Sequence, residues 1–247
     1  MVTVERWHHA QDYERGYWER QADAIARGAE AQLDWYRWRA MQLAHRLDEL
    51  GLQRLTDGSA RVVEIGSGPV GVAAYLPAAE RVAVDPLARR YAELEVLTAL
   101  RSPDVDYREG MGESLPCPSG AYDLALIENC IDHVQDIDAV MAEVARVLRP
   151  DGVLYLTVNC RTAWGYLVHR TLSRLMVDRG HPHTFTAGRA RALVSRVGYE
   201  LLWFQTDSAA QARREDLASS DPRTRLKGIL GVSEFVASAV TRRVPVS

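Results

Sequence analysis

Three glycines and a following acid are the residues whose types and spacing most clearly indicate chemistry. Gly66, Gly68 and Gly71 come directly after the apolar run 62–65, and Asp85 ends a second apolar run. Glycine has no Cβ, so the chain can turn sharply here and its backbone can approach a ligand. A carboxylate at Asp85 can accept hydrogen bonds from both hydroxyls of a ribose. The stretch 61–87 therefore predicts strand, glycine turn, helix, strand and acid, a cradle for a nucleotide-like ligand at the carboxyl edge of a parallel sheet.

The glycine spacing alone does not identify that ligand. The pattern also satisfies the dinucleotide-binding motif, so an NAD(P)-dependent oxidoreductase stays open at this point. Glu64 helps to tell the possible ligands apart, because it stands in a strand position that would normally be apolar. The segment Val63-Glu64-Ile65-Gly66-Ser67-Gly68 resembles the first motif of the class I S-adenosylmethionine-dependent methyltransferases, apolar-acid-apolar-Gly-x-Gly. The resemblance implies that Glu64 faces the cationic end of S-adenosylmethionine and that the first amides of the next helix face its carboxylate.

Later segments extend this resemblance over roughly residues 60 to 205. The loop 109–116 is similar to the family's adenine-binding loop at Glu113, Leu115 and Pro116, with Met111 where the family often has an aspartate. A thioether there could pack on the adenine ring. The phrases 121–127 and 143–152 also resemble family segments, which a nicotinamide enzyme would not repeat. The resemblance assigns the following residues to the cofactor: Glu64, Gly66, Ser67, Gly68, Gly71, Asp85, Pro86, Met111, Gly112, Glu113, Glu128 and Asn129.

The N-terminal segment 1–55 is predicted to form two helices broken near Gly28. It carries four of the six tryptophans together with several tyrosines. Aromatic residues at helical spacing usually anchor a helix on a core, but large flat side chains also suit an apolar pocket or lid. By analogy with related enzymes, Tyr17 and Trp18 are expected to close over the methionine end of the cofactor.

The predicted architecture is α/β. We expect a Rossmann-like, doubly wound sheet, mostly parallel with an antiparallel last strand, and an N-terminal helical cap. The expected domains are the cap, 1–55, and a cofactor-binding domain, 56–247, with a helical insertion around 161–180. Helices are expected at 72–76, 88–100, 136–148, 164–176 and 187–197, and strands at 153–158 and 199–206. Residues 228–240 could form either a strand or a helix.

Composition narrows the function classes. The 247 residues are 47% hydrophobic and 26% charged, with a net charge of −3, which fits an ordinary globular protein and gives no overall attraction to nucleic acid. The cysteines, Cys117, Cys130 and Cys160, form no Cys-x-x-Cys pair, which suits a reducing compartment. No signal peptide or membrane-spanning run is found, so a cytoplasmic protein without a membrane partner is expected. The amphipathic helix 164–176 could cover the active site or form a homodimer face.

Histidines are the candidate catalytic residues. Methyl transfer from a sulfonium is an in-line displacement in which positioning supplies much of the acceleration and a base is optional. His133, just past the fourth predicted strand, and then His183 are the candidates for taking the acceptor's proton. No cluster with metal-ligand spacing is found in the sequence, and no metal is expected. The predicted function is methyl transfer to an O or N atom of a small organic molecule, with bacterial secondary metabolism as a leaning. A methyltransferase-like fold without methylation, as a partner subunit or with other chemistry, is a further alternative.

Overall fold

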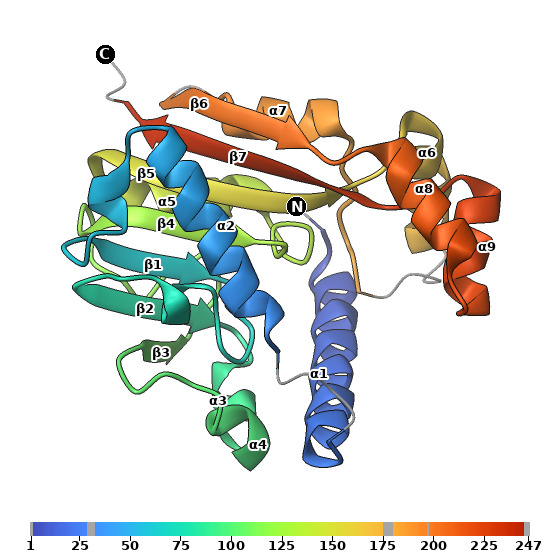
Figure 1. The fold of residues 1–247 in the computed structure, drawn as a ribbon, viewed down its shortest axis with the longest axis horizontal. Coiled ribbons are helices and arrows are strands. Elements are labelled where there is room, and N and C mark those ends of the chain that lie inside the picture. The colour runs from blue at the N-terminus through green and yellow to red at the C-terminus, as the bar shows by residue number, and fades with distance from the viewer. Residues whose placement is uncertain (1, 29–32, 175–179, 197, 245–247) are drawn as a thin grey trace.

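One mixed β-sheet organises the molecule. The computed structural model describes residues 2–28, 33–174, 180–196 and 198–244. Within them, seven strands follow the order β3-β2-β1-β4-β5-β7-β6 (Figure 1). Strand β7 is antiparallel to both of its neighbours, and the other pairs are parallel. The strands are β1 Arg61–Ile65, β2 Glu80–Asp85, β3 Asp106–Glu109, β4 Tyr122–Glu128, β5 Leu148–Cys160, β6 Tyr199–Thr206 and β7 Phe235–Arg243. The predicted sheet, including its antiparallel last strand, is confirmed.

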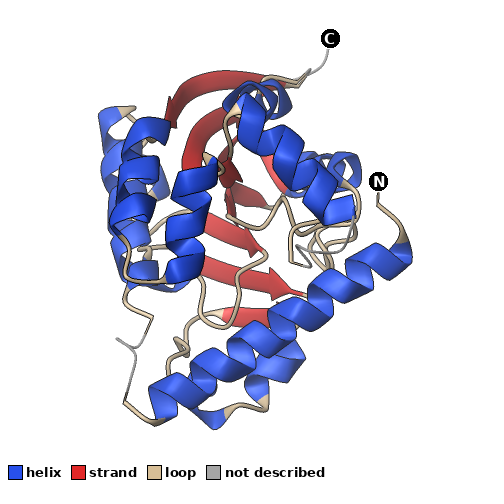
Figure 2. Ribbon diagram, turned by 90° about the vertical axis from the view of Figure 1, so that its right-hand side faces the viewer, coloured by secondary structure: helices blue, strands red, loops and turns tan. Residues whose placement is uncertain are grey.

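Helices cover both faces of the sheet, as Figure 2 shows. They are α1 Val4–Ala26, α2 Trp35–Glu49, α3 Ala88–Ala92, α4 Glu95–Thr98, α5 Ile137–Val147, α6 Ala163–Arg174, α7 Ala187–Val194, α8 Ala209–Ala218 and α9 Pro222–Leu230, with 3-10 turns at Gln53–Leu55 and Ala73–Tyr75. None of the helices in the described parts of the chain combines the length and apolar content needed to cross a membrane.

Alternating side chains of the strands build two apolar cores. Val63 and Ile65 of β1 pack with α5 and α7 on one face, and Val62 packs with α2 on the other. Successive strand residues point to opposite faces, so a strand buried on both sides must be apolar throughout. Glu64 is the exception in β1, and it is 1% exposed. Burying a charged group is costly unless hydrogen bonds satisfy it, so Glu64 must have hydrogen-bond partners in the turn that follows β1.

Helix α1 lies across the carboxyl ends of the central strands (Figures 1 and 2). Three of its four buried residues, Trp18, Ala22 and Ile25, belong to the same core as α2 and the sheet. The two helices predicted for residues 1–55 are therefore present, and α1 stands over the sheet edge where ligands bind in open α/β folds. The domain boundary near residue 55 stays a prediction.

Several element predictions were wrong in detail. The expected helix at 72–76 is only a 3-10 turn at Ala73–Tyr75, because Pro77 follows at once. The expected helix 88–100 is two short helices, α3 and α4. Helix α7 ends at Val194 rather than at 197, and residues 228–240 contribute the end of α9 and most of β7. The predicted helix 164–176 corresponds to α6 as far as Arg174; its last two positions lie outside the described residues.

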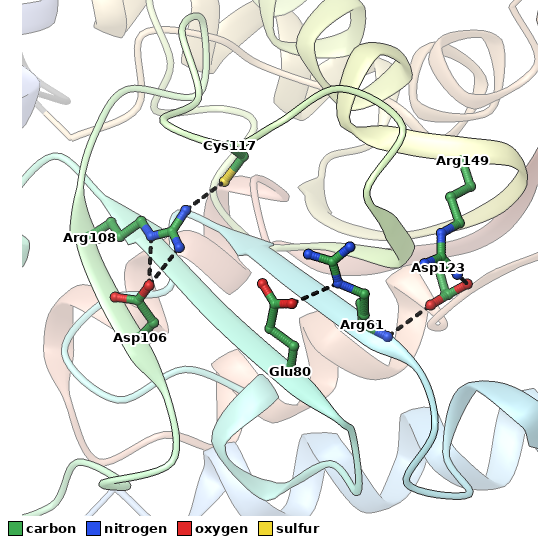
Figure 3. Close-up of polar contacts among 7 residues, drawn as sticks. All are labelled: Arg61, Glu80, Asp106, Arg108, Cys117, Asp123 and Arg149. Carbon is green, nitrogen blue, oxygen red and sulfur yellow. Dashed lines mark hydrogen bonds and ion pairs between the residues drawn. The ribbon is translucent and has the colours of Figure 1, made fainter.

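Charged residues pair at the amino ends of the strands, opposite the proposed ligand edge (Figure 3). Arg61 contacts Glu80 at 2.6 Å, and Arg149 contacts Asp123 at 2.7 Å. The backbone N–H of Arg61 also donates to Asp123 Oδ2 at 2.9 Å. Asp123 and Arg149 belong to two of the segments that resemble methyltransferases, and here they tie β1, β4 and β5 together. Their role in this chain is to fix the strands that carry the site.

Candidate active site

A cavity opens at the carboxyl ends of β1, β2 and β4, beneath α1 and the start of α2. Eleven of the twelve residues that the sequence assigned to the cofactor lie in its wall, and Gly71 does not. Tyr17 and Trp18 also line it, and their closure over a cofactor stays a prediction. Its lining comprises Trp7, Gln11, Glu14, Tyr17, Trp18, Trp35, Tyr36, Arg39, Glu64, Ile65, Gly66, Ser67, Gly68, Asp85, Pro86, Leu87, Met111, Gly112, Glu113, Glu128, Asn129, Cys130, His133 and Val134.

The glycine turn after β1 forms the floor of this cavity. Gly68 has φ +61°, and a Cβ built on it would lie 2.5 Å from the Tyr36 hydroxyl and 3.3 Å from the Trp18 ring. Only glycine fits both the backbone conformation and the space. The Tyr36 hydroxyl donates to the Ser67 carbonyl at 3.2 Å. Helices α1 and α2 therefore touch the turn directly and fix its backbone.

Glu64 holds the turn from beneath. Its two carboxylate oxygens accept hydrogen bonds from the backbone N–H groups of Val72, at 3.0 Å, and Ala73, at 2.8 Å. A Cβ on Gly71 would lie 2.7 Å from Glu64 Oε2. Gly71 therefore makes room for this carboxylate, and its expected contact with the cofactor stays a prediction. Burial raises the pKa of Glu64 to about 7, although the two amides oppose the shift. Contact of Glu64 with a ligand cation stays a prediction.

Asp85 stands at the end of β2 and closes the turn from the side. Gly68 N–H donates to its Oδ2 at 2.9 Å, and Leu87 N–H donates to its Oδ1 at 2.8 Å. Burial raises the pKa of Asp85 to about 6, against the effect of those two hydrogen bonds. Each carboxylate oxygen has a further lone pair, so these bonds orient the group without exhausting its capacity to accept.

Two unsatisfied acceptors lie at the end of β4. Glu128 contacts Arg39 at 3.3 Å through Oε1, while its Oε2 and the Asn129 side-chain oxygen are buried without hydrogen-bond partners. Asn129 also has φ +52°, a strained conformation held by bonds from its N–H to Thr157. Buried unsatisfied acceptors are rare and costly. Both residues line the cavity, so a ligand with a cationic donor would satisfy them.

The loop after β3 supplies another part of the wall through Met111, Gly112 and Glu113. Glu113 Oε1 accepts from the N–H groups of Gln135, at 2.7 Å, and Asp136, at 3.0 Å. This carboxylate therefore holds the entry to α5 in addition to facing the cavity. Contact of these three residues with an adenine stays a prediction.

One face of α1 forms the roof. Trp7, Gln11, Glu14 and Trp18 recur three or four residues apart and all line the cavity, and Trp18 Nε1 donates to a Glu14 oxygen at 2.8 Å. The aromatic residues of this face were predicted from the sequence, but Gln11 and Glu14 were not, although their helical spacing between two tryptophans was a usable signal.

The two candidate histidines are separated by the structure. His133 lines the cavity, whereas His183 lines a different one and its Nε2 is 2.9 Å from the Val134 carbonyl. A carbonyl only accepts, so this nitrogen of His183 donates and is not a free base. Burial lowers the pKa of His183. His183 is therefore the weaker of the two candidates and its catalytic role stays a prediction, whereas His133 lines the cavity.

Comparison with known proteins agrees with this geometry. Residues 63–156 match the model of the methyltransferase domain family. Over 85 residues the chain is 26% identical to a ubiquinone biosynthesis O-methyltransferase of Brucella ovis, which covers 34% of each protein. The chain spans about a third, or less, of the curated relatives it matches first.

Solved structures share the fold at low identity. A protein of Galdieria sulphuraria, described provisionally as a sarcosine dimethylglycine methyltransferase, has a TM-score of 0.61 at 17% identity, covering 83% of this chain and 85% of that one. A phosphoethanolamine N-methyltransferase of Haemonchus contortus, solved with S-adenosylhomocysteine, has a TM-score of 0.53 at 13% identity, covering 80% of this chain and 52% of that one. Residues 63–156 are thus a methyltransferase domain by family match, and the fold around them is the one seen in solved structures of S-adenosylmethionine-dependent methyltransferases.

Proposed function

We propose that the protein transfers a methyl group from S-adenosylmethionine to an O or N atom of a small organic molecule. The observation that carries this proposal is the placement of Gly68, Asp85 and the unsatisfied acceptors of Glu128 and Asn129 around one cavity. A nucleoside with a cationic amino-acid tail matches that set. The oxidoreductase alternative is not favoured, because the domain match is to methyltransferases.

Each part of the cavity suits one part of this cofactor. The carboxylate of Asp85 accepts the ribose hydroxyls, and Met111 with Gly112 packs on the adenine. The orphan oxygens of Glu128 and Asn129 accept from the ammonium group. The backbone of Gly66 to Gly68 approaches the ligand closely. The pyrophosphate of a nicotinamide dinucleotide would instead meet three buried or half-buried carboxylates, which disfavours it.

The chain's own contribution is positioning and exclusion of water. S-adenosylmethionine supplies a methyl group activated by a sulfonium. Trp7, Tyr17 and Trp18 cover the cavity from α1, beside the polar Gln11 and Glu14, while the glycine turn fixes the floor. Holding two reacting groups in line can remove about 7–11 kcal/mol of barrier. His133, which also lines the cavity, is our candidate for taking the acceptor's proton.

The acceptor proposed is a small molecule rather than a polymer. The aromatic roof encloses the cavity, and the net charge of −3 gives no general attraction to nucleic acid. The named activity of the Brucella relative, an O-methyltransferase of ubiquinone biosynthesis, supports an oxygen acceptor on an organic ring or chain. A metabolic role in bacteria, including secondary metabolism, is consistent with these features.

Calorimetric titration tests the proposal. S-adenosylmethionine, S-adenosylhomocysteine and the two nicotinamide dinucleotides are titrated separately into the full chain. We expect both adenosyl compounds to bind and neither dinucleotide to do so. Asp85→Ala should lower the affinity for S-adenosylhomocysteine at least tenfold, because two ribose hydrogen bonds are lost. Binding of a dinucleotide without either adenosyl compound would overturn the proposal.

A further inference from the structure

Three potential metal ligands meet beside the cavity. Asp132 and His133 follow β4, and His181 precedes α7, yet one ligand atom of each lies within 4.8 Å of those of the other two. His133 Nε2 is 3.9 Å from Asp132 Oδ1, and the His133 and His181 rings are 4.7 Å apart between centroids. We propose that these three residues bind a divalent transition-metal ion such as Zn²⁺ or Fe²⁺. No metal was expected from the sequence, since ligands about 50 residues apart leave no spacing signature.

Backbone hydrogen bonds hold the two loops together at this point. His183 N–H donates to the Asp132 carbonyl at 3.1 Å, and His183 Nε2 donates to the Val134 carbonyl at 2.9 Å. The N–H of His133 donates to the Cys130 carbonyl at 3.0 Å, which closes the turn that carries two of the ligands. These hydrogen bonds hold the two loops in place without using the three proposed metal-binding atoms. The cluster is therefore preformed. His183, the weaker catalytic candidate, acquires a positioning role.

The buried carboxylate indicates that a cation belongs here. Asp132 is 3% exposed, and its Oδ1 is buried without a hydrogen-bond partner. Among the described residues it pairs with no lysine or arginine, and the His133 contact at 3.9 Å is too long for a hydrogen bond. An unpaired buried carboxylate is strongly disfavoured, whereas a carboxylate bound to a metal is a common solution. A divalent ion at this point would satisfy Oδ1.

The ligand types favour a transition metal over magnesium or calcium. Two imidazoles with one carboxylate suit Zn²⁺ and Fe²⁺, and three protein ligands leave coordination positions open for another ligand. Mg²⁺ and Ca²⁺ prefer oxygen ligands throughout. At metal–ligand distances of about 2.0–2.2 Å the ligand atoms lie roughly 3–3.5 Å apart. The observed separations, up to 4.8 Å, therefore close by small side-chain rotations.

The methyl acceptor would bind the ion at its open coordination positions. This extension rests on the proposed methyl transfer. His133 lines the cavity, so an ion bound to it would lie beside the space proposed for the acceptor. A hydroxyl bound to a divalent ion loses its proton more readily, as metal-bound water does. The O–H bond breaks, the proton goes to solvent and the oxygen keeps both electrons, so no oxidant or reductant is needed. With the ion bound, His133 is a ligand, and the ion takes over the ionisation otherwise assigned to a base.

Cobalt titration tests the site without requiring a substrate. The full chain, stripped of metal by a chelator, is titrated with Co²⁺ and followed by visible absorption, and Zn²⁺ is then added in competition. All proteins carry H8A and H9A, which removes a pair of adjacent histidines that could bind metal at the surface. Asp132→Asn and His181→Ala are compared with His45→Ala, an exposed histidine on α2.

We expect one Co²⁺ per chain with absorption bands of low coordination number, displaced by Zn²⁺ but not by a hundredfold excess of Mg²⁺. Asp132→Asn and His181→Ala should each weaken binding more than the roughly 10–100-fold typical of outer-shell changes, and His45→Ala should not. Neither residue lines the cavity, so both variants should keep the parent's affinity for S-adenosylhomocysteine, which also reports correct folding.

Equal Co²⁺ affinity in the parent and in Asp132→Asn, or absence of any Co²⁺ band, would overturn the metal site while leaving the proposed function intact. Failure of S-adenosylhomocysteine to bind the parent protein would instead count against methyl transfer, whatever the outcome with cobalt.

Discussion

Replacing Glu64 by glutamine should change how the protein's stability depends on pH. Burial raises the pKa of this carboxyl from its ordinary value of 4.5 to about 7 in the folded chain. The folded state therefore binds a proton more tightly than the unfolded state, and stability falls as pH rises from about 4.5 to 7. Each tenfold change in proton affinity corresponds to about 1.4 kcal/mol. The full effect is about 3 kcal/mol, most of it between pH 5 and pH 8.

Urea unfolding at several pH values measures this effect. The quantity compared is the free energy of unfolding of the wild type minus that of E64Q. Because Asp85 and other groups titrate in both proteins, the difference isolates Glu64. We expect it to decrease by about 2–3 kcal/mol between pH 5 and pH 8, as the wild type becomes charged at a buried position and glutamine does not.

Glu143, whose pKa is shifted in the opposite direction to that of Glu64, provides a control. Its hydrogen bonds to Arg146 lower the pKa of Glu143, so its titration lies below pH 5 and the difference between the wild type and E143Q should stay constant from pH 5 to pH 8. A wild-type minus E64Q difference that is constant, or that grows with pH, would refute the reasoning. It would mean that the amides of Val72 and Ala73 outweigh burial and keep the carboxylate ionised.

Three further changes test the packing of the site. Gly68→Ala should destabilise the protein by roughly 1–3 kcal/mol and weaken S-adenosylhomocysteine binding, because the new Cβ meets Tyr36. The control Gly188→Ala, in open space on α7, should instead stabilise the protein by about 0.4–1 kcal/mol. Equal changes in the free energy of unfolding for the two variants, measured with urea, would contradict this expectation. Arg39→Leu leaves Glu128 without its ion-pair partner, so at pH 8 we expect a loss of stability of roughly 1–3 kcal/mol. This loss should shrink toward pH 5, because burial raises the pKa of Glu128 and its carboxyl then takes up a proton. A loss of stability that does not depend on pH would argue that the ion pair is unimportant. Tyr36→Phe removes the hydrogen bond to the Ser67 carbonyl and should cost about 1 kcal/mol in the same assay, with no change expected if the turn is held by Asp85 alone.

The sequence predicted the parts of the site that lie next to each other along the chain. The run 62–65 is apolar apart from Glu64, and the glycines follow it directly, so a buried strand and a turn could be inferred from local pattern. Asp85 could be placed because parallel strands end at one edge of the sheet. Even the exception, Glu64, was visible as a charged residue in a buried position, although its bonds to Val72 and Ala73 depended on the turn's exact path.

Features that depend on contacts between distant segments could not be predicted. The predicted helix lengths near Pro77 and in 88–100 were wrong, because hydrophobic periodicity does not reveal where a chain must bend back to the sheet. His183 carries the same side chain as His133, and only the tertiary structure reveals that its ring faces the Val134 carbonyl. Asp132 and His181 are about 50 residues apart, so no spacing rule joins them.

We propose that these two groups of residues divide the site by function. The cofactor end is built from strand termini and the turn after β1, whose backbone geometry permits few alternatives: a Cβ on Gly68 collides with Tyr36, and the carboxylate of Asp85 is oriented by two amides. On this proposal the acceptor end is formed by the part of α1 before Tyr17 and by the loop after β4, whose Gln11, Glu14 and His133 line the cavity and lie outside the sheet. A chain could then keep its cofactor while changing its acceptor by substituting residues such as Gln11 and Glu14. The identity of the acceptor is consequently to be sought in α1 and in the loop after β4, and not in the glycine turn.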